Sequence, residues 1–154
     1  MIRPLLAALL ATALLAVSLP AVDHAERERS AARTGATAAT LAERIDRFAA
    51  RNDPVAPSLP GASRVVSVGL PRGVTVRIDD AVRWRAGGRS GEVRTDPPLD
   101  TPGGTLELRG GEHRLALGHV RCPDGPVVTL RRFKSDGAAT PSRVPERPLP
   151  DVCV

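Results

Sequence analysis

The sequence predicts an α+β protein in which an N-terminal membrane or stalk helix precedes a small antiparallel β-sheet domain. Three observations support this prediction. Pro4 to Val22 contain no charged residue. Residues 23–52 lack proline and are rich in alanine, a composition that favours helix. From residue 63 onward the apolar residues alternate with polar ones, as they do in strands with one buried face.

These changes of pattern divide the chain of 154 residues into five segments. We expect a transmembrane anchor or signal segment at 1–22, a helical stalk at 23–53, a linker at 54–62, an antiparallel β domain at 63–136, and a proline-rich tail tied by a cysteine at 137–154.

The apolar run is just long enough to cross a bilayer. It also has the features of a cleavable signal peptide, since Arg3 precedes it and Ala16-Val17-Ser18 offers small residues for cleavage. Pro20 would kink a membrane helix or end the apolar part of a signal peptide. We favour a retained, single-pass anchor with the C-terminal domain outside the cytoplasm, the alternative being secretion after cleavage. Basic residues on both sides of the run leave its orientation open.

The stalk carries one narrow apolar stripe. Leu41, Ile45 and Phe48 stand at i, i+4 and i+7, so they share one helix face. Asn52-Asp53-Pro54 ends the pattern because a residue that precedes proline leaves the helical region. The stripe predicts either packing of the stalk on the β domain or assembly with helices of neighbouring copies.

Alternating runs predict the strands. We expect strands at 64–68, 73–78, 81–85 and, more weakly, 91–94, with Asp79-Asp80 as a tight turn. Two runs at 105–109 and 113–117 surround Gly110-Gly111, a pair typical of a hairpin turn. Residues 127–134 complete the series. One face of these strands is apolar and the other carries Arg, Glu and Thr, as in a sheet buried on one side.

The two cysteines, Cys122 and Cys153, are too few for a metal site, which takes four ligands. In an extracytoplasmic chain they would pair. Such a disulfide would stabilise the domain by roughly 3–4 kcal/mol. Two unpaired thiols on the cytoplasmic side are the alternative.

Arginine dominates the positive charge. The net charge is +5, and Lys134 is the one lysine among 22 basic residues. The outer sheet face therefore predicts a surface for an anionic ligand, such as lipid headgroups or an acidic partner, with a merely solvated face as the alternative. Specific nucleic acid is not expected, because aromatic residues for base stacking make up only 2%. The candidate residues of this face are Arg77, Arg83, Arg85, Arg109 and Arg114.

No pattern predicts catalysis. There is no Gly-x-Ser-x-Gly elbow, and the paired aspartates suit turns. None of the Gly-Gly pairs opens a helix, as a phosphate loop must. His113, His119 and Cys122 lie close in sequence but lack a carboxylate to complete a metal site. We therefore expect no catalytic residue, no metal and no cofactor.

The layout of an apolar N-terminal helix, a polar stalk, an antiparallel sheet and a C-terminal cysteine pair resembles that of type IV pilin-like proteins. The processing site and early glutamate of that family are absent here. GASRVVSVGLP and VVTLRRFKSDGAATP resemble segments of small haloarchaeal membrane proteins associated with pilus-type secretion. This resemblance implies a non-enzymatic, membrane-anchored accessory protein with the membrane and other protein subunits as partners. The alternative is a secreted or anchored binding module whose arginine face takes an anionic ligand.

Overall fold

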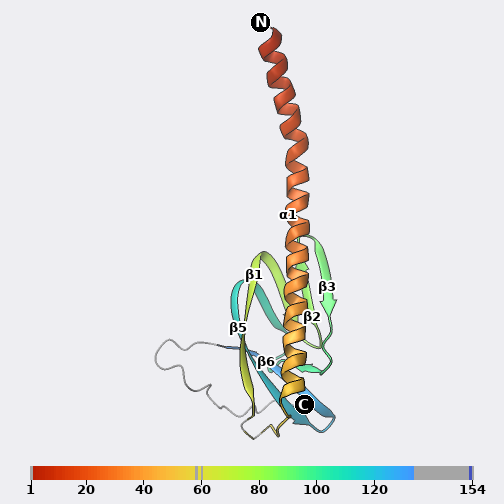
Figure 1. The fold of residues 1–154 in the computed structure, drawn as a ribbon, viewed down its shortest axis with the longest axis vertical. Coiled ribbons are helices and arrows are strands. Elements are labelled where there is room, and N and C mark those ends of the chain that lie inside the picture. Colours follow the sequence, from red (N-terminus) through yellow and green to blue (C-terminus); the bar gives the residue numbers. More distant parts are fainter. Residues whose placement is uncertain (1, 58, 60, 134–152, 154) are drawn as a thin grey trace, which may run out of the picture.

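The computed structural model describes residues 2–57, 59, 61–133 and 153. One long helix, α1 (Ile2–Arg51), runs the length of the molecule, and a curled sheet wraps around its C-terminal half (Figure 1). The turn at Gly87 meets the helix at Arg27, and the residues before this point extend beyond the sheet. The helical segments predicted on either side of Asp23 are therefore one continuous element.

The prediction of a membrane helix is wrong. Among the residues described, no helix is long and apolar enough to cross a membrane. A membrane span takes about 20 predominantly apolar residues. The uncharged stretch of α1 is bounded by Arg3 and Asp23 and includes Thr12, Ser18 and Pro20.

The sheet has six strands in the order β3-β2-β1-β5-β6-β4. Five of them pair antiparallel, as predicted, but β4 lies parallel to β6, so the sheet is mixed. No strand is predicted for residues 95–104, which include β4, because they lack an alternating apolar pattern. The strands are β1 (Ser63–Ile78), β2 (Val82–Ala86), β3 (Arg89–Val93), β4 (Leu99–Asp100), β5 (Leu106–Cys122) and β6 (Gly125–Arg132).

Two long strands replace four predicted short ones. The runs at 64–68 and 73–78 are both part of β1, and β5 continues straight through Gly110-Gly111, so the predicted hairpin there is wrong. Residues 71–74 of β1 lie opposite Gly110 alone, which forms a bulge. A Cβ on Gly110 would stand 2.6 Å from the carbonyl oxygen of Pro71. The glycine is therefore needed for the close approach of two bent strands.

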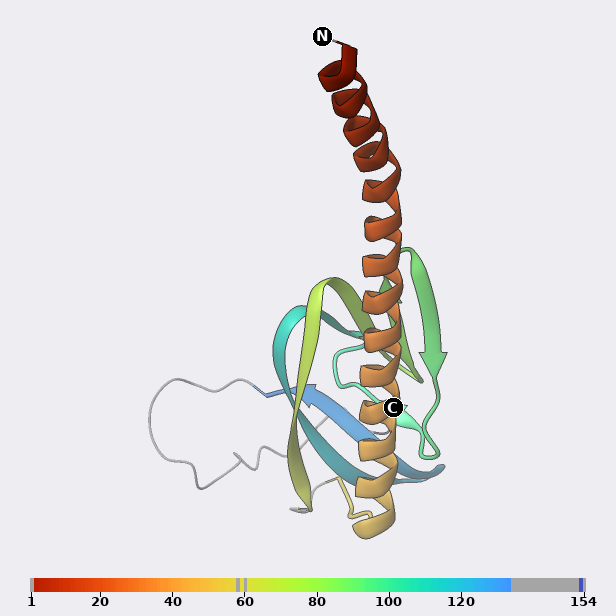
Figure 2. The same ribbon diagram turned by 45° about the horizontal axis from the view of Figure 1, so that its top comes forward.

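The inner face of the sheet is buried against the stripe of α1. Leu41, Ile45 and Phe48 are each at most 3% exposed, which confirms the predicted packing of the stalk on the β domain. They belong to one cluster with apolar residues that alternate along β1 and β5, and the sheet curls around the helix (Figure 2). The sheet side of this core includes Val66, Val68, Val76, Ile78, Leu108, Leu115 and Leu117.

Hydrogen bonds tie the end of α1 to β5. The Asn52 side chain donates to the carbonyl of Phe48 at 2.7 Å, and the Nδ1–H of His119 donates to the Asn52 carbonyl at 2.6 Å. Val55, in the predicted linker, then pairs with Val120 as an isolated parallel bridge. These bonds hold the chain that follows α1 against β5, and β1 then begins beside the same strand.

The structure joins Cys122 to Cys153 in a disulfide with their Cα atoms 5.4 Å apart. The predicted pairing is therefore present. The rest of the predicted tail, and Lys134 at the end of the last predicted strand, lie outside the described residues.

Truncation of the stripe should destabilise the whole fold. We expect Ile45→Ala to lower the free energy of unfolding by about 2–5 kcal/mol, because it leaves a cavity in the core. Urea denaturation followed by circular dichroism measures the change. Thr40→Ala, on the exposed side of α1, is the control and should change the free energy of unfolding little. Equal effects of the two variants would contradict the packing described here.

Removal of the disulfide should also cost stability. The bond closes a loop of 31 residues, so Cys122→Ser with Cys153→Ser should lower the free energy of unfolding by about 3–4 kcal/mol. Chemical denaturation with and without reductant measures this. The intact mass of the protein from its native cell fraction should show the loss of two hydrogens. Two free thiols in that material would contradict the pairing.

Candidate arginine hollow

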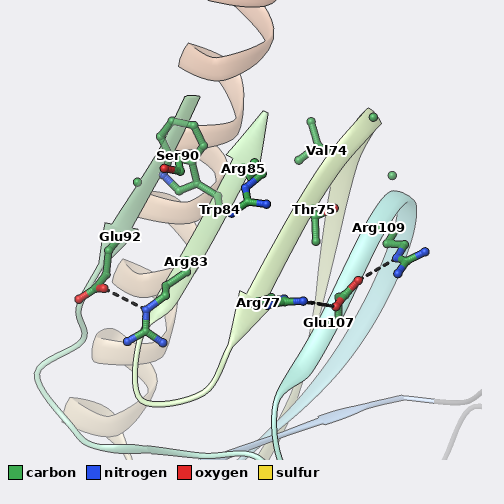
Figure 3. Close-up of a pocket in the computed structure, with 13 residues that line it drawn as sticks. Val74, Thr75, Arg77, Arg83, Trp84, Arg85, Ser90, Glu92, Glu107 and Arg109 are labelled. Carbon is green, nitrogen blue, oxygen red and sulfur yellow. Dashed lines mark hydrogen bonds and ion pairs between the residues drawn. The ribbon is translucent and has the colours of Figure 1, made fainter. Parts of the chain in front are cut away.

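The sheet face opposite α1 carries two rows of polar side chains that cross β3, β2, β1 and β5. The first row is Glu92, Arg83, Arg77 and Glu107, and the second is Ser90, Arg85, Thr75 and Arg109. These residues share a face because side chains alternate along each strand, and their partners in the register stand beside them. Figure 3 shows them with α1 behind the strands.

The first row is an ordered series of ion pairs. The Nε–H of Arg83 donates to Glu92 at 3.0 Å, and Arg77 donates to Glu107 at 3.2 Å. Arg83 also pairs with Asp80 at 2.8 Å and with Asp79 in the turn before β2. Two adjacent arginines in the middle of the row are therefore held by carboxylates at its ends and in the turn.

Glu107 is shared between the rows. It accepts from Arg77 and also from the Nε–H of Arg109, the latter at 2.8 Å. The bonds from Arg109 and then Arg77 lower the pKa of Glu107, and bonds from Arg94 and then Arg83 lower the pKa of Glu92. The bond to Asp80, followed by that to Glu92, raises the pKa of Arg83.

The sign of these shifts determines how the ion pairs respond to acid. Because folding lowers the pKa of both glutamates, the pairs favour the folded chain above the ordinary glutamate pKa of 4.5. That contribution is lost as the pH falls through the lowered values. Protonation of Glu107 would also free Arg77 and Arg109 for another anion.

Arg85 differs from its neighbours. Across the described part of the chain it has no ion pair or hydrogen-bond partner, and it stands between the hydroxyls of Ser90 and Thr75.

The two rows line a hollow of about 760 Å³. We call this feature the arginine hollow. Its four arginines outnumber its two glutamates, so it carries a net positive charge. It is lined by Gly73, Val74, Thr75, Arg77, Arg83, Trp84, Arg85, Ser90, Gly91, Glu92, Glu107, Arg109 and Gly110.

Trp84 connects the hollow to the helix. A Cβ on Gly91 would stand 2.7 Å from its indole, and one on Gly35 of α1 would stand 3.2 Å from it. Both glycines make room for the ring. The local sequence around Gly35 gives no sign of this contact, because Trp84 comes from a strand far away in the chain.

The structure brings four of the five predicted arginines together and separates the fifth. Arg77, Arg83, Arg85 and Arg109 line the hollow. Arg114 lies beyond the bulge, opposite Ser67, and its guanidinium stacks over Phe133 at 4.9 Å from the ring centre. Sequence reasoning missed the roles of Glu92 and Glu107. The signal for them is a spacing of two residues, from Glu92 to Arg94 and from Glu107 to Arg109.

The histidines take structural positions. His119 is buried and bonded to the end of α1, and His113 contacts the carbonyl oxygen of Arg109 through Nε2. Within the described ranges no group of three or more His, Cys, Asp or Glu side chains could hold a metal ion. The arginine hollow is the feature that gathers several guanidinium donors in one concave region.

Comparison with known proteins identifies the family of this chain but assigns it no activity. No curated protein and no solved structure matches the chain. A family model described as a domain of unknown function, DUF7311, matches residues 1–133, which include α1 and all six strands. The chain therefore belongs to the DUF7311 family.

Proposed function

We propose that this protein is a non-enzymatic, extracytoplasmic binding module that takes an anionic ligand in the arginine hollow. The observation that carries the proposal is Arg85, an arginine that has no carboxylate partner among the described residues and lies in a hollow of net positive charge. An unpaired guanidinium presents a planar set of donors that suits carboxylate, sulfate or phosphate. The hydroxyls of Ser90 and Thr75 beside it can complete the contacts.

Two further features support this proposal. Arg77 and Arg109 both donate to the carboxylate of Glu107, so guanidinium groups of the hollow are placed to contact a carboxylate. The disulfide between Cys122 and Cys153 supports a location outside the cytoplasm, because disulfides persist in oxidising compartments. Export of the protein with cleavage of its N-terminal segment agrees with this location.

Charge substitutions in the hollow should change anion binding in opposite directions. Arg85→Gln should elute from a sulfopropyl matrix at lower salt than the native protein, because it removes the unpaired guanidinium. Glu107→Gln should elute at higher salt, because it frees Arg77 and Arg109. Salt gradients at neutral pH measure both effects.

Matched controls separate the hollow from overall charge. Arg121→Gln and Glu26→Gln make the same charge changes at exposed positions outside the hollow. If Arg85→Gln elutes with Arg121→Gln, and Glu107→Gln with Glu26→Gln, retention depends only on net charge and the hollow is a solvated face.

As a second candidate function, we propose an accessory protein of a surface-filament or secretion assembly. The part of α1 that extends beyond the sheet favours this candidate. Leu9, Leu10 and Leu14 are each 63% or more exposed there, and Val22 is 55% exposed. Exposed apolar side chains on one element suggest contact with other subunits.

Substitutions at the projecting part of α1 test this second candidate. If the helix mediates assembly, Leu10→Glu with Leu14→Glu should abolish oligomers of the full-length chain, because charges would be buried at the contact. Sedimentation velocity measures the oligomeric state. Arg29→Glu, on the more C-terminal part of α1, serves as the exposed control. A full-length chain that is monomeric before any substitution would contradict self-assembly.

A further inference from the structure

We infer that the arginine hollow binds an acidic polysaccharide that lies across the strands, so that two of its anionic groups contact Arg85 and Arg109. This inference rests on the proposed function and specifies its ligand. It follows from how far apart the two arginines stand, from what lies between them, and from the shape of the surface.

The second row sets the spacing of the ligand's charges. Arg85 is on β2 and Arg109 is on β5, with β1 between them. Neighbouring strands lie about 4.8 Å apart, so the two arginines leave the sheet about 10 Å apart. Both guanidinium groups reach one carboxylate or sulfate only if the two side chains bend toward each other over Thr75. A polymer with regularly repeated anionic groups can contact both at once.

The residues between and beside the two arginines suit a sugar backbone. Thr75 stands between Arg85 and Arg109, and Ser90 continues the row beyond Arg85. Their hydroxyls both donate and accept hydrogen bonds, as sugar hydroxyls require. A row of arginine and hydroxyl side chains therefore matches alternating anionic and hydroxyl groups.

Other anionic polymers and surfaces fit less well. Single-stranded nucleic acid binds through stacking of bases on exposed aromatic rings. Trp84 is the aromatic residue among those that line the hollow, and it packs against the hydrophobic core beside Gly35 and Gly91. A lipid surface is flat on this scale, whereas these side chains line a concave region of about 760 Å³. An extended chain can enter such a hollow.

Trp84 provides the readout, because it is the one tryptophan of the chain and lines the hollow. Its fluorescence is followed during titration with galacturonic acid and with oligogalacturonates of increasing length. We expect weak binding of the monomer and a steep rise in affinity once an oligomer reaches both arginines. Arg85→Gln with Arg109→Gln should lower the affinity for the longer oligomers at least about tenfold, since each charged hydrogen bond contributes strongly. Methyl-esterified oligomers should not bind.

The control variant is Arg64→Gln with Arg121→Gln, two exposed arginines outside the hollow, and it should retain full affinity. An affinity per carboxylate that does not depend on oligomer length would overturn the spanning geometry and leave a site for a single anion. Tighter binding of a single-stranded DNA oligomer or of phosphatidylglycerol vesicles at equal charge would overturn the polysaccharide assignment. If no anion binds and the sulfopropyl elution is also unaffected by Arg85→Gln, the proposed function itself fails.

Discussion

Burial of one sheet face against α1 is the contact on which the rest of the structure depends. A domain of this size has little apolar surface to bury, and the described core contains almost no aromatic residue. Ile45, Ile78, Leu108 and Leu115 are fully buried at this contact. Since side chains alternate along a strand, the same packing that points these residues toward the helix points their charged neighbours away from it. The position of the arginine hollow is thus a consequence of the core.

The bulge between β1 and β5 lets two long strands follow the curved surface of the helix. Pro71 cannot donate a backbone hydrogen bond, and the chain beside it includes Gly73 with φ of 75°. These residues interrupt the ladder without ending either strand. The disulfide at Cys122 and the hydrogen bond from His119 to the Asn52 carbonyl hold the far end of β5. The bulge bends β1 and β5 in the middle, and the contacts at the end of β5 fix that strand. Together they shape the sheet around α1 (Figure 2).

Carboxylates within the hollow control how much positive charge it offers. Glu92 and Glu107 neutralise Arg83, Arg77 and Arg109 in part, while Arg85 keeps its full charge. An incoming anion would compete with Glu107 for two guanidinium groups. Such competition weakens binding to random anions and favours a ligand with several anionic groups, because each added contact helps to displace an internal one.

The sequence by itself determined the stripe of α1, the assignment of apolar and charged residues to opposite sheet faces, and the cysteine pair. Each of these follows from periodicity or from residue chemistry, which are local properties. Only the tertiary structure decided that Gly110-Gly111 lies inside a strand, because the close approach of Pro71 comes from a segment far away in the chain. It likewise decided that Arg77, Arg83, Arg85 and Arg109 share a hollow while Arg114 does not. The pairing of strands that are distant in the chain sets which of these side chains are neighbours.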